Sequence, residues 1–116
     1  MSREPHLESA VMEILWNASQ PLTPSQVHTE LKSARAIAYT TVLTAVSRLW
    51  KKGLLTRTRR GRTYTYLPRE GRADSAARRM EELLAATRER NLTLARFIDN
   101  LSASDRRELR RFLEHE

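Results

Sequence analysis

The stretch Tyr39–Pro68, YTTVLTAVSRLWKKGLLTRTRRGRTYTYLP, places a helix pattern, a glycine and a basic hairpin pattern in direct succession. Apolar residues recur at helical spacing over about 39–52, which predicts a helix with one buried face. The residues of that face are Val42, Ala45, Val46 and Leu49. The opposite face carries Thr40, Thr44, Ser47 and Lys51, with Thr41 and Arg48 along one edge. A hydroxyl-rich outer face of this kind is typical of a helix that reads DNA.

The end of this helix and the hairpin are both marked by glycine. Gly53 follows two lysines, so it is placed for a left-handed C-terminal cap beside charges that suit the helix dipole. The runs LLTRT (54–58) and TYTYL (63–67) alternate like strands around a predicted basic turn over 59–62. The two tyrosines of the second run share a face, and we expect both to pack against the helices.

Basic charge is concentrated in this same part of the chain. Residues 1–72 contain 12 Lys and Arg against 5 Asp and Glu, whereas residues 73–116 contain 9 of each sign. Between Arg48 and Arg69 there are 8 basic residues and no acidic residue. Such a single-sign block indicates polyanion binding. Arg57, Arg59, Arg60 and Arg62 cluster at and beside the predicted turn, where phosphates would be reachable.

Two further helices are predicted before the helix at about 39–52. A stripe of apolar residues predicts the first over about 5–17, and we expect Trp16 at its end to pack into the core. Thr23 and Gln26 form a capping box, with Pro24 at the first helical position, and together they open a second helix over about 24–33. The short turn to the helix at 39 predicts a helix-turn-helix. With the basic hairpin as wing, residues 1–70 are expected to form a winged-helix DNA-binding domain.

Beyond residue 70 the pattern is purely helical. Helices are predicted over about 73–89 and 92–101, and a capping box at Ser102 and Asp105 opens a third. So short a segment cannot bury its own apolar stripes, so we expect residues 71–116 to be a dimerisation domain of two interleaved copies. The alternative is a monomer whose helices fold back on the winged helix. The dimerisation residues would be Met80, Leu83, Leu84, Leu94, Phe97, Ile98, Leu101, Leu109, Phe112 and Leu113.

The composition argues against several other classes of protein. There is no cysteine, and His6, His28 and His115 are scattered without metal-ligand spacing. We therefore expect no enzyme, no metal and no cofactor. The N-terminal residues are charged and no window is apolar enough for a membrane span, so a cytoplasmic protein is expected. The fold class is mainly α with a small β-hairpin wing: a winged helix-turn-helix followed by a C-terminal helical dimerisation segment.

Several motifs taken together resemble the penicillinase-repressor (BlaI/MecI/CopY) family of bacterial transcriptional repressors. They are LESAVMEILW, VHTEL, AYTTVLTAVSRLWKKGLL and RRGRTYTYLP, followed by the tail LARFIDNLSASDRRELRRFLE. The resemblance covers essentially the whole chain. It implies a homodimer that represses transcription by binding a palindromic double-stranded DNA operator with TACA/TGTA-type half-sites, and a link to antibiotic resistance regulation.

The resemblance also implies roles for particular residues. The positions that match the family's base-reading residues are Thr40, Thr41, Leu43 and Thr44. Leu43 has no hydrogen-bonding side chain, so its role would be apolar, for example against a thymine methyl group. Contacts to the DNA backbone are expected from Tyr39, Ser47, Arg48, Lys51, Lys52, Arg59, Arg60 and Arg62.

The resemblance leaves the inducing signal open. A membrane sensor protease is one candidate partner, and the bond that corresponds to the family's cleavage site is Arg96–Phe97. Release by a ligand bound in a small cleft at the dimer interface is the other route. Copper sensing is disfavoured because the copper-responsive branch carries cysteine pairs. Outside DNA-binding repressors, the competing interpretation is a winged helix used as a protein-interaction adaptor or an RNA-binding module.

Overall fold

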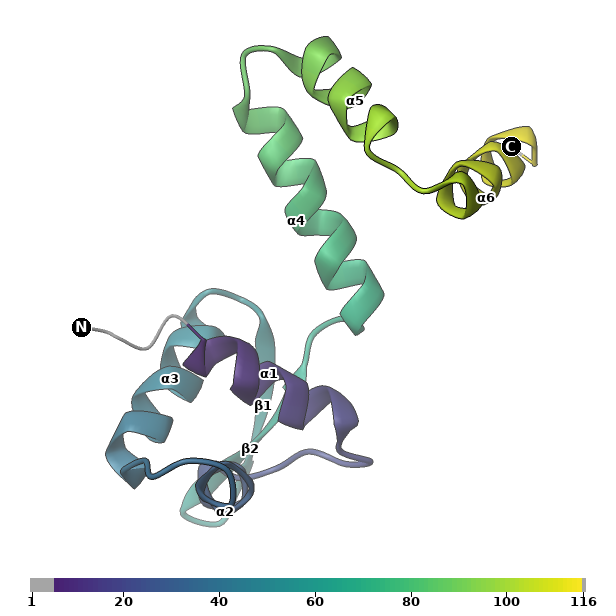
Figure 1. Ribbon diagram of the computed structural model, residues 1–116. Helices are drawn as coiled ribbons and strands as arrows, with labels where there is room; N and C mark the ends of the chain where they lie inside the picture. The colour runs from purple at the N-terminus through teal and green to yellow at the C-terminus, as the bar shows by residue number, and fades with distance from the viewer. Residues whose placement is uncertain (1–5, 116) are drawn as a thin grey trace. The chain divides into compact units, whose positions relative to one another are not determined.

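The computed structural model describes residues 6–115, in which six helices and one two-stranded antiparallel hairpin are found (Figure 1). The elements are α1 (Leu7–Asn17), α2 (Pro24–Lys32), α3 (Tyr39–Lys51), β1 (Leu55–Arg60), β2 (Thr63–Pro68), α4 (Arg72–Ala86), α5 (Arg90–Asp99) and α6 (Ala103–Glu114). All of the predicted elements are present, and the mainly α winged-helix fold class is confirmed. Pro5, where the first helix was expected to begin, lies outside the described residues.

The chain forms two compact units, which divide between Asp74 and Ser75. The first contains α1 to β2 and holds the core. Its buried apolar side chains are Leu7, Val11, Met12, Leu15, Val27, Leu31, Val42, Ala45, Val46, Leu49, Leu55 and Tyr66. Each of the three helices and both strands contributes to this list, so the hairpin is packed onto the helices as part of one core. In the described part of the chain, no helix is both long and apolar enough to cross a membrane.

Local signals explain where α2 and α3 begin and end. Thr23 Oγ1 accepts a hydrogen bond from the Gln26 N–H at 3.2 Å, and Gln26 Oε1 accepts one from the Thr23 N–H at 2.8 Å. The predicted capping box is therefore confirmed. At the end of α3, the Gly53 N–H donates to Trp50 O and the Leu54 N–H to Leu49 O, both at 3.0 Å. With φ +84° at Gly53, this is a Schellman cap.

The hairpin is longer and its turn is tighter than the sequence predicted. Arg59 and Arg60 belong to β1, and the turn contains only Gly61 and Arg62, because Arg60 pairs with Thr63. Gly61 has φ +63°, the backbone that a type II′ hairpin needs at its first central residue. The predicted turn over 59–62 is thus corrected at its start, since glycine at that position permits a two-residue loop.

A third segment joins the hairpin, which the sequence did not reveal. Leu22, in the connector after α1, forms an isolated antiparallel bridge with Tyr66 of β2. The Tyr66 N–H donates to Leu22 O at 2.7 Å, and the Leu22 N–H donates to Tyr66 O at 3.1 Å. Tyr66 is 5% exposed, so β2 is tied to the helices by backbone and side chain together.

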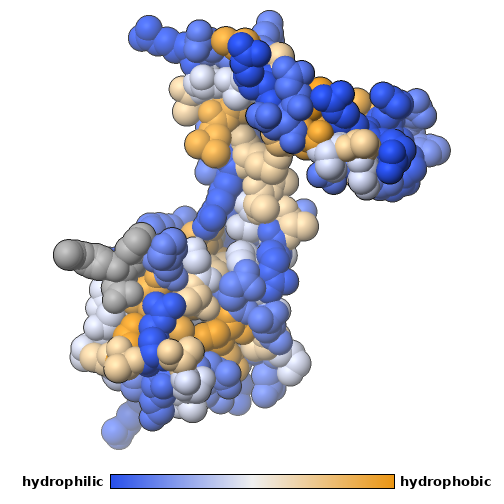
Figure 2. Space-filling model, in the orientation of Figure 1, coloured by the Kyte–Doolittle hydropathy of each residue, from blue (hydrophilic) through white to orange (hydrophobic). Residues whose placement is uncertain are grey.

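The second unit contains most of α4 together with α5 and α6. The Ser102 side chain accepts a hydrogen bond from the Asp105 N–H at 3.0 Å, which supplies the first half of the predicted capping box at the start of α6. No residue of α5 or α6 is buried within the described chain. Orange side chains in Figure 2 reach the surface of this unit, where large apolar residues would ordinarily be covered.

Candidate nucleic-acid interface

The α3 helix presents its polar face to solvent. Thr40, Thr41 and Thr44 are exposed, and Leu43 beside them is 39% exposed. The opposite face of α3 is in the core, so the helix cannot turn this polar face inward. The Thr44 hydroxyl donates to Thr40 O at 2.9 Å, which commits its hydrogen to the helix backbone. Thr44 can therefore offer a base edge its oxygen lone pairs and its methyl group, and Leu43 can offer an apolar contact.

The beginning of α3 is held by His28 of α2. His28 Nε2 lies 2.8 Å from Ile37 O, and because a carbonyl oxygen only accepts, this nitrogen must carry the hydrogen. The His28 ring also meets the Tyr39 ring edge to face, with centroids 5.8 Å apart. Tyr39 remains 41% exposed at the beginning of α3. His28 is half-buried.

The other polar residues of α3 fall into two groups. Arg48 and Lys51 are exposed on or beside the reading face, and Ser47 is half-buried there. Lys52 lies nearer the core face, and its Nζ is 2.7 Å from Glu8 Oε1 in α1. The positive charge of Lys52 is therefore balanced within the protein. Its expected contact to a DNA backbone stays a prediction and would require this pair to open.

The arginines of the hairpin are divided between its two faces. Cross-strand pairing places Arg57 opposite Tyr66 and Arg59 opposite Tyr64, so both arginines share the face of the tyrosines. Arg60 pairs with Thr63 on the other face, while Arg62 lies in the turn; both are exposed. Arg59 is also engaged at the tip, because its Nε donates to Gly61 O at 3.1 Å. The packing of both tyrosines against the helices agrees with the prediction. The division of the arginines between the two faces follows from the cross-strand register, which was not predicted from the sequence.

The contacts of Arg57 were not predicted from the sequence. Its guanidinium carbon lies 3.5 Å from the ring centroid of Trp50 and 3.9 Å from that of Tyr64. All three side chains are half-buried. The stack joins the last turn of α3 to both strands of the hairpin.

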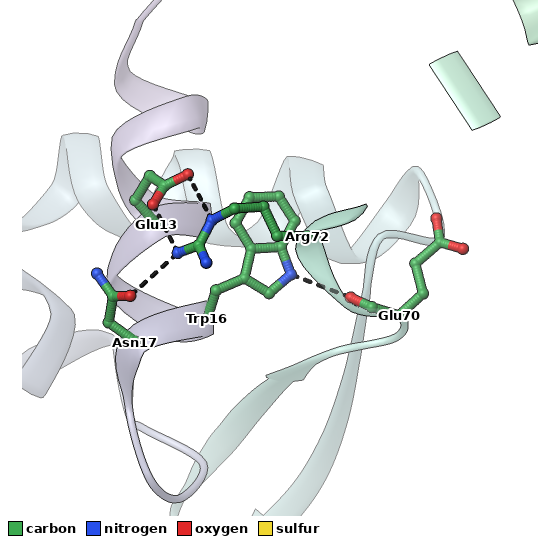
Figure 3. A network of polar contacts seen from close by, with 5 residues as sticks. All are labelled: Glu13, Trp16, Asn17, Glu70 and Arg72. Atoms are coloured by element: carbon green, nitrogen blue, oxygen red, sulfur yellow. Dashed lines mark hydrogen bonds and ion pairs between the residues drawn. The ribbon is translucent and has the colours of Figure 1, made fainter. Parts of the chain in front are cut away.

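A polar network secures the passage from the hairpin into α4 (Figure 3). Trp16 Nε1 donates to Glu70 O at 3.0 Å, so the predicted packing of Trp16 includes a hydrogen bond. Arg72 donates to both carboxylate oxygens of Glu13, at 3.2 and 2.7 Å, and to Asn17 Oδ1 at 3.0 Å. The hydrogen bond from Arg72 lowers the pKa of Glu13 below its ordinary value, and the charge of Arg72 adds to this effect.

The apolar residues predicted for dimerisation are exposed or half-buried in the second unit. Exposure is largest at Leu83 (74%) and Leu113 (64%) and is 44% at Phe97. An open, mostly apolar cleft of about 470 Å³ lies between α4 and α5. Its apolar lining residues are Ala77, Met80, Leu83, Leu84, Leu94 and Phe97. Leu101 and Leu109 are half-buried, as is Leu84.

Within residues 6–115, no group of three or more histidine or acidic side chains is arranged to hold a metal ion. The residues that the structure does bring together are those of α3 and the hairpin. They form one surface element of hydroxyl and basic side chains on a rigid core.

The chain is similar to known transcriptional regulators. Two proteins called transcriptional regulator BlaI, from two strains of Mycobacterium tuberculosis, are each 38% identical to the chain over 116 residues. Each alignment covers 97% of this chain and 84% of the relative. The solution structure of the DNA-binding domain of the repressor BlaI superposes with a TM-score of 0.54 and 30% identity. That superposition covers 64% of this chain and 93% of the domain.

The sequence profile described as penicillinase repressor matches residues 5–115, which is nearly the whole chain. This match and the M. tuberculosis relatives confirm the resemblance carried by the sequence motifs. Because the family is one of repressors and these relatives are transcriptional regulators, the matches also support the expectation that the chain is not an enzyme. The chain belongs to the penicillinase repressor family.

Proposed function

We propose that this protein is a transcriptional repressor that binds a palindromic DNA operator as a homodimer. One observation carries the proposal: the threonine face of α3 is exposed beside a basic hairpin, and the burial of the opposite face in the core keeps it exposed. DNA binding itself has the support of the family and of the neighbouring BlaI DNA-binding domain. The palindromic operator and the homodimer go beyond that support and are proposed from the residues described below.

The α3 helix is proposed to enter the major groove. Thr40, Thr41 and Thr44 are short and lose little side-chain entropy on contact, and Leu43 suits a thymine methyl group. A TACA/TGTA half-site supplies such methyl groups and adenine amino groups that the Thr44 oxygen can accept from. These four side chains therefore carry the proposed base readout.

The basic residues are proposed to hold the DNA backbone. Arg48, Lys51, Arg60 and Arg62 are exposed, and no acidic residue lies between positions 48 and 69. Each phosphate that they neutralise releases counterions, so affinity should fall steeply with salt. These contacts set the register of the protein on the duplex but carry no sequence information.

Residues 71–116 are proposed to form the dimer. The apolar side chains of α4, α5 and α6 are too exposed for a stable isolated unit, and a second copy would cover them. A symmetric dimer presents two reading helices to half-sites about one DNA turn apart, roughly 34–36 Å. The palindrome follows from that symmetry.

The test is a salt titration of binding to a TACA/TGTA palindrome and to a scrambled duplex of equal length. The proposal predicts tighter binding to the palindrome, two protomers per duplex and a steep loss of affinity with salt. Equal affinity for both duplexes would contradict this operator. Absence of binding at low salt would contradict DNA binding altogether and favour the adaptor interpretation.

A further inference from the structure

The contacts of Arg57 differ from those of the other hairpin arginines. Its guanidinium lies between two ring faces, 3.5 Å from the centroid of Trp50 and 3.9 Å from that of Tyr64. Trp50 belongs to α3, Arg57 to β1 and Tyr64 to β2. The side chain of Arg57 therefore links its own strand to the other two elements that form the proposed interface.

The chemistry of the stack suits a structural role. A planar guanidinium is attracted to the face of an aromatic ring, and tryptophan is the strongest such partner. The partners that the structure gives to the Arg57 charge are the ring faces of Trp50 and Tyr64. With both of its faces covered, Arg57 has only its edge left for a phosphate.

The stack is continuous with the core. The Tyr64 ring meets the Tyr66 ring at a centroid distance of 6.4 Å, and Tyr66 is a core residue. At the other end, Trp50 lies seven residues after Leu43, which puts both on the same edge of α3. The hairpin is thus clamped to the edge of the helix that also carries a proposed base-reading residue.

We propose that Arg57 is a positioning residue, which fixes the wing against α3 so that Arg60 and Arg62 reach phosphates while α3 occupies the groove. This inference rests on the proposed function and deepens it. Arg57 then contributes to affinity through the Trp50–Arg57–Tyr64 stack and not through a phosphate contact of its own. Its charge is dispensable, whereas a side chain that fills the space between the rings is required.

Methionine separates these two roles. Arg57→Met removes the charge but keeps an unbranched chain whose sulfur packs favourably against aromatic rings. Arg57→Ala removes both the charge and the packing. Arg60→Ala is the matched control, because it removes one positive charge from the same strand without touching the stack.

The first measurement uses the free full-length protein and does not depend on DNA. In a Trp16→Phe background, Trp50 is the only tryptophan, so acrylamide quenching reports its accessibility. Arg57→Ala should increase quenching, Arg57→Met should leave it close to that of the background protein, and Arg60→Ala should not change it. Unchanged quenching in Arg57→Ala would overturn the clamp, whatever the protein binds.

The second measurement is the affinity for the palindromic duplex over a range of salt concentrations. Arg57→Ala should weaken binding by about tenfold, because the side chain that packs between the two rings and holds the hairpin against α3 is lost. Arg57→Met should bind within about threefold of the unsubstituted protein and keep its salt slope, because no phosphate contact is removed. Arg60→Ala should reduce the slope by about 0.9 for each protomer bound.

Two results would overturn the inference. If both Arg57 variants lose affinity equally and each reduces the salt slope by about 0.9 for each protomer bound, Arg57 is a phosphate ligand. If neither variant loses affinity, the stack does not position the wing. Failure of the unsubstituted protein to bind DNA would instead contradict the proposed function, and the quenching experiment would still decide whether the clamp exists.

Discussion

Arg72, in the first turn of α4, donates hydrogen bonds to both carboxylate oxygens of Glu13 in α1, at 3.2 and 2.7 Å. Both side chains are half exposed, so the pair is screened by solvent and its contribution to stability is small. Its effect is local: together with the Trp16–Glu70 hydrogen bond, it attaches the start of α4 to α1.

Glu13 should make stability depend on pH in the acidic range. The pKa of Glu13 is lowered in the folded protein, so its contribution is present at neutral pH and is lost as pH falls through the folded-state value. Glu13→Gln should therefore lower the melting temperature slightly at pH 7 and leave it unchanged in strong acid. Thermal unfolding by circular dichroism between these limits checks this. A difference that grows as pH falls would contradict the assigned sign.

Gly61 should be sensitive to substitution because of its backbone alone. A Cβ at this position would meet nothing within 4 Å, but the φ of +63° is costly for any residue with a side chain. Gly61→Ala should destabilise the first unit by about 1–2 kcal/mol. Gly71→Ala is the control, since Gly71 has equally open surroundings and no positive φ. Urea unfolding of both variants should show a loss for Gly61→Ala only.

Arg60 and Lys52 should differ in their effect on DNA binding although each carries one charge. Arg60 is exposed on the hairpin, whereas Lys52 is paired with Glu8 at 2.7 Å. Arg60→Ala should weaken binding to palindromic and scrambled duplexes alike and reduce the salt slope by about 0.9 for each protomer bound. Lys52→Ala should leave the slope nearly unchanged. Equal slopes for the two variants would show that the Glu8 pair opens on DNA.

Thr44 should affect the choice of sequence. Its hydroxyl hydrogen is committed to Thr40 O, so the oxygen and the methyl group are what a base can meet. Thr44→Ala should change the preferred half-site, with a loss of about 1–3 kcal/mol against the best sequence. Selection from a randomised half-site library measures this directly. A uniform loss over all sequences would place Thr44 against the DNA backbone.

Phe97 should be required for dimerisation. It is 44% exposed in the second unit, on the apolar cleft between α4 and α5. Phe97→Glu should shift the protein to a monomer in sedimentation equilibrium, because a charge would be buried at the interface without a partner. Leu67→Glu is the control, since Leu67 is also 44% exposed but lies in the hairpin. Dissociation by both variants, or by neither, would contradict the assigned interface.

Much of the fold could be predicted because its signals are local. The capping residues Thr23 and Gln26, the glycine at position 53 and the helical spacing of the α3 core face all act within a few residues of one another. Each of these predictions agrees with the structure. The turn was placed too broadly because the sequence RRGR does not itself say which residues pair across the strands.

What the sequence by itself determined is the order of the elements, the buried faces of the helices and the presence of a basic hairpin after a hydroxyl-rich helix. Only the tertiary structure decided which basic side chains face solvent and which have partners inside the protein. Lys52 meets Glu8 across 44 positions, and Arg72 meets Glu13 across 59. Arg57 contacts Trp50 and Tyr64 only because the strands pair as they do. The sequence shows which side chains are charged. Which partner each charged side chain has is decided by packing between residues far apart in the chain.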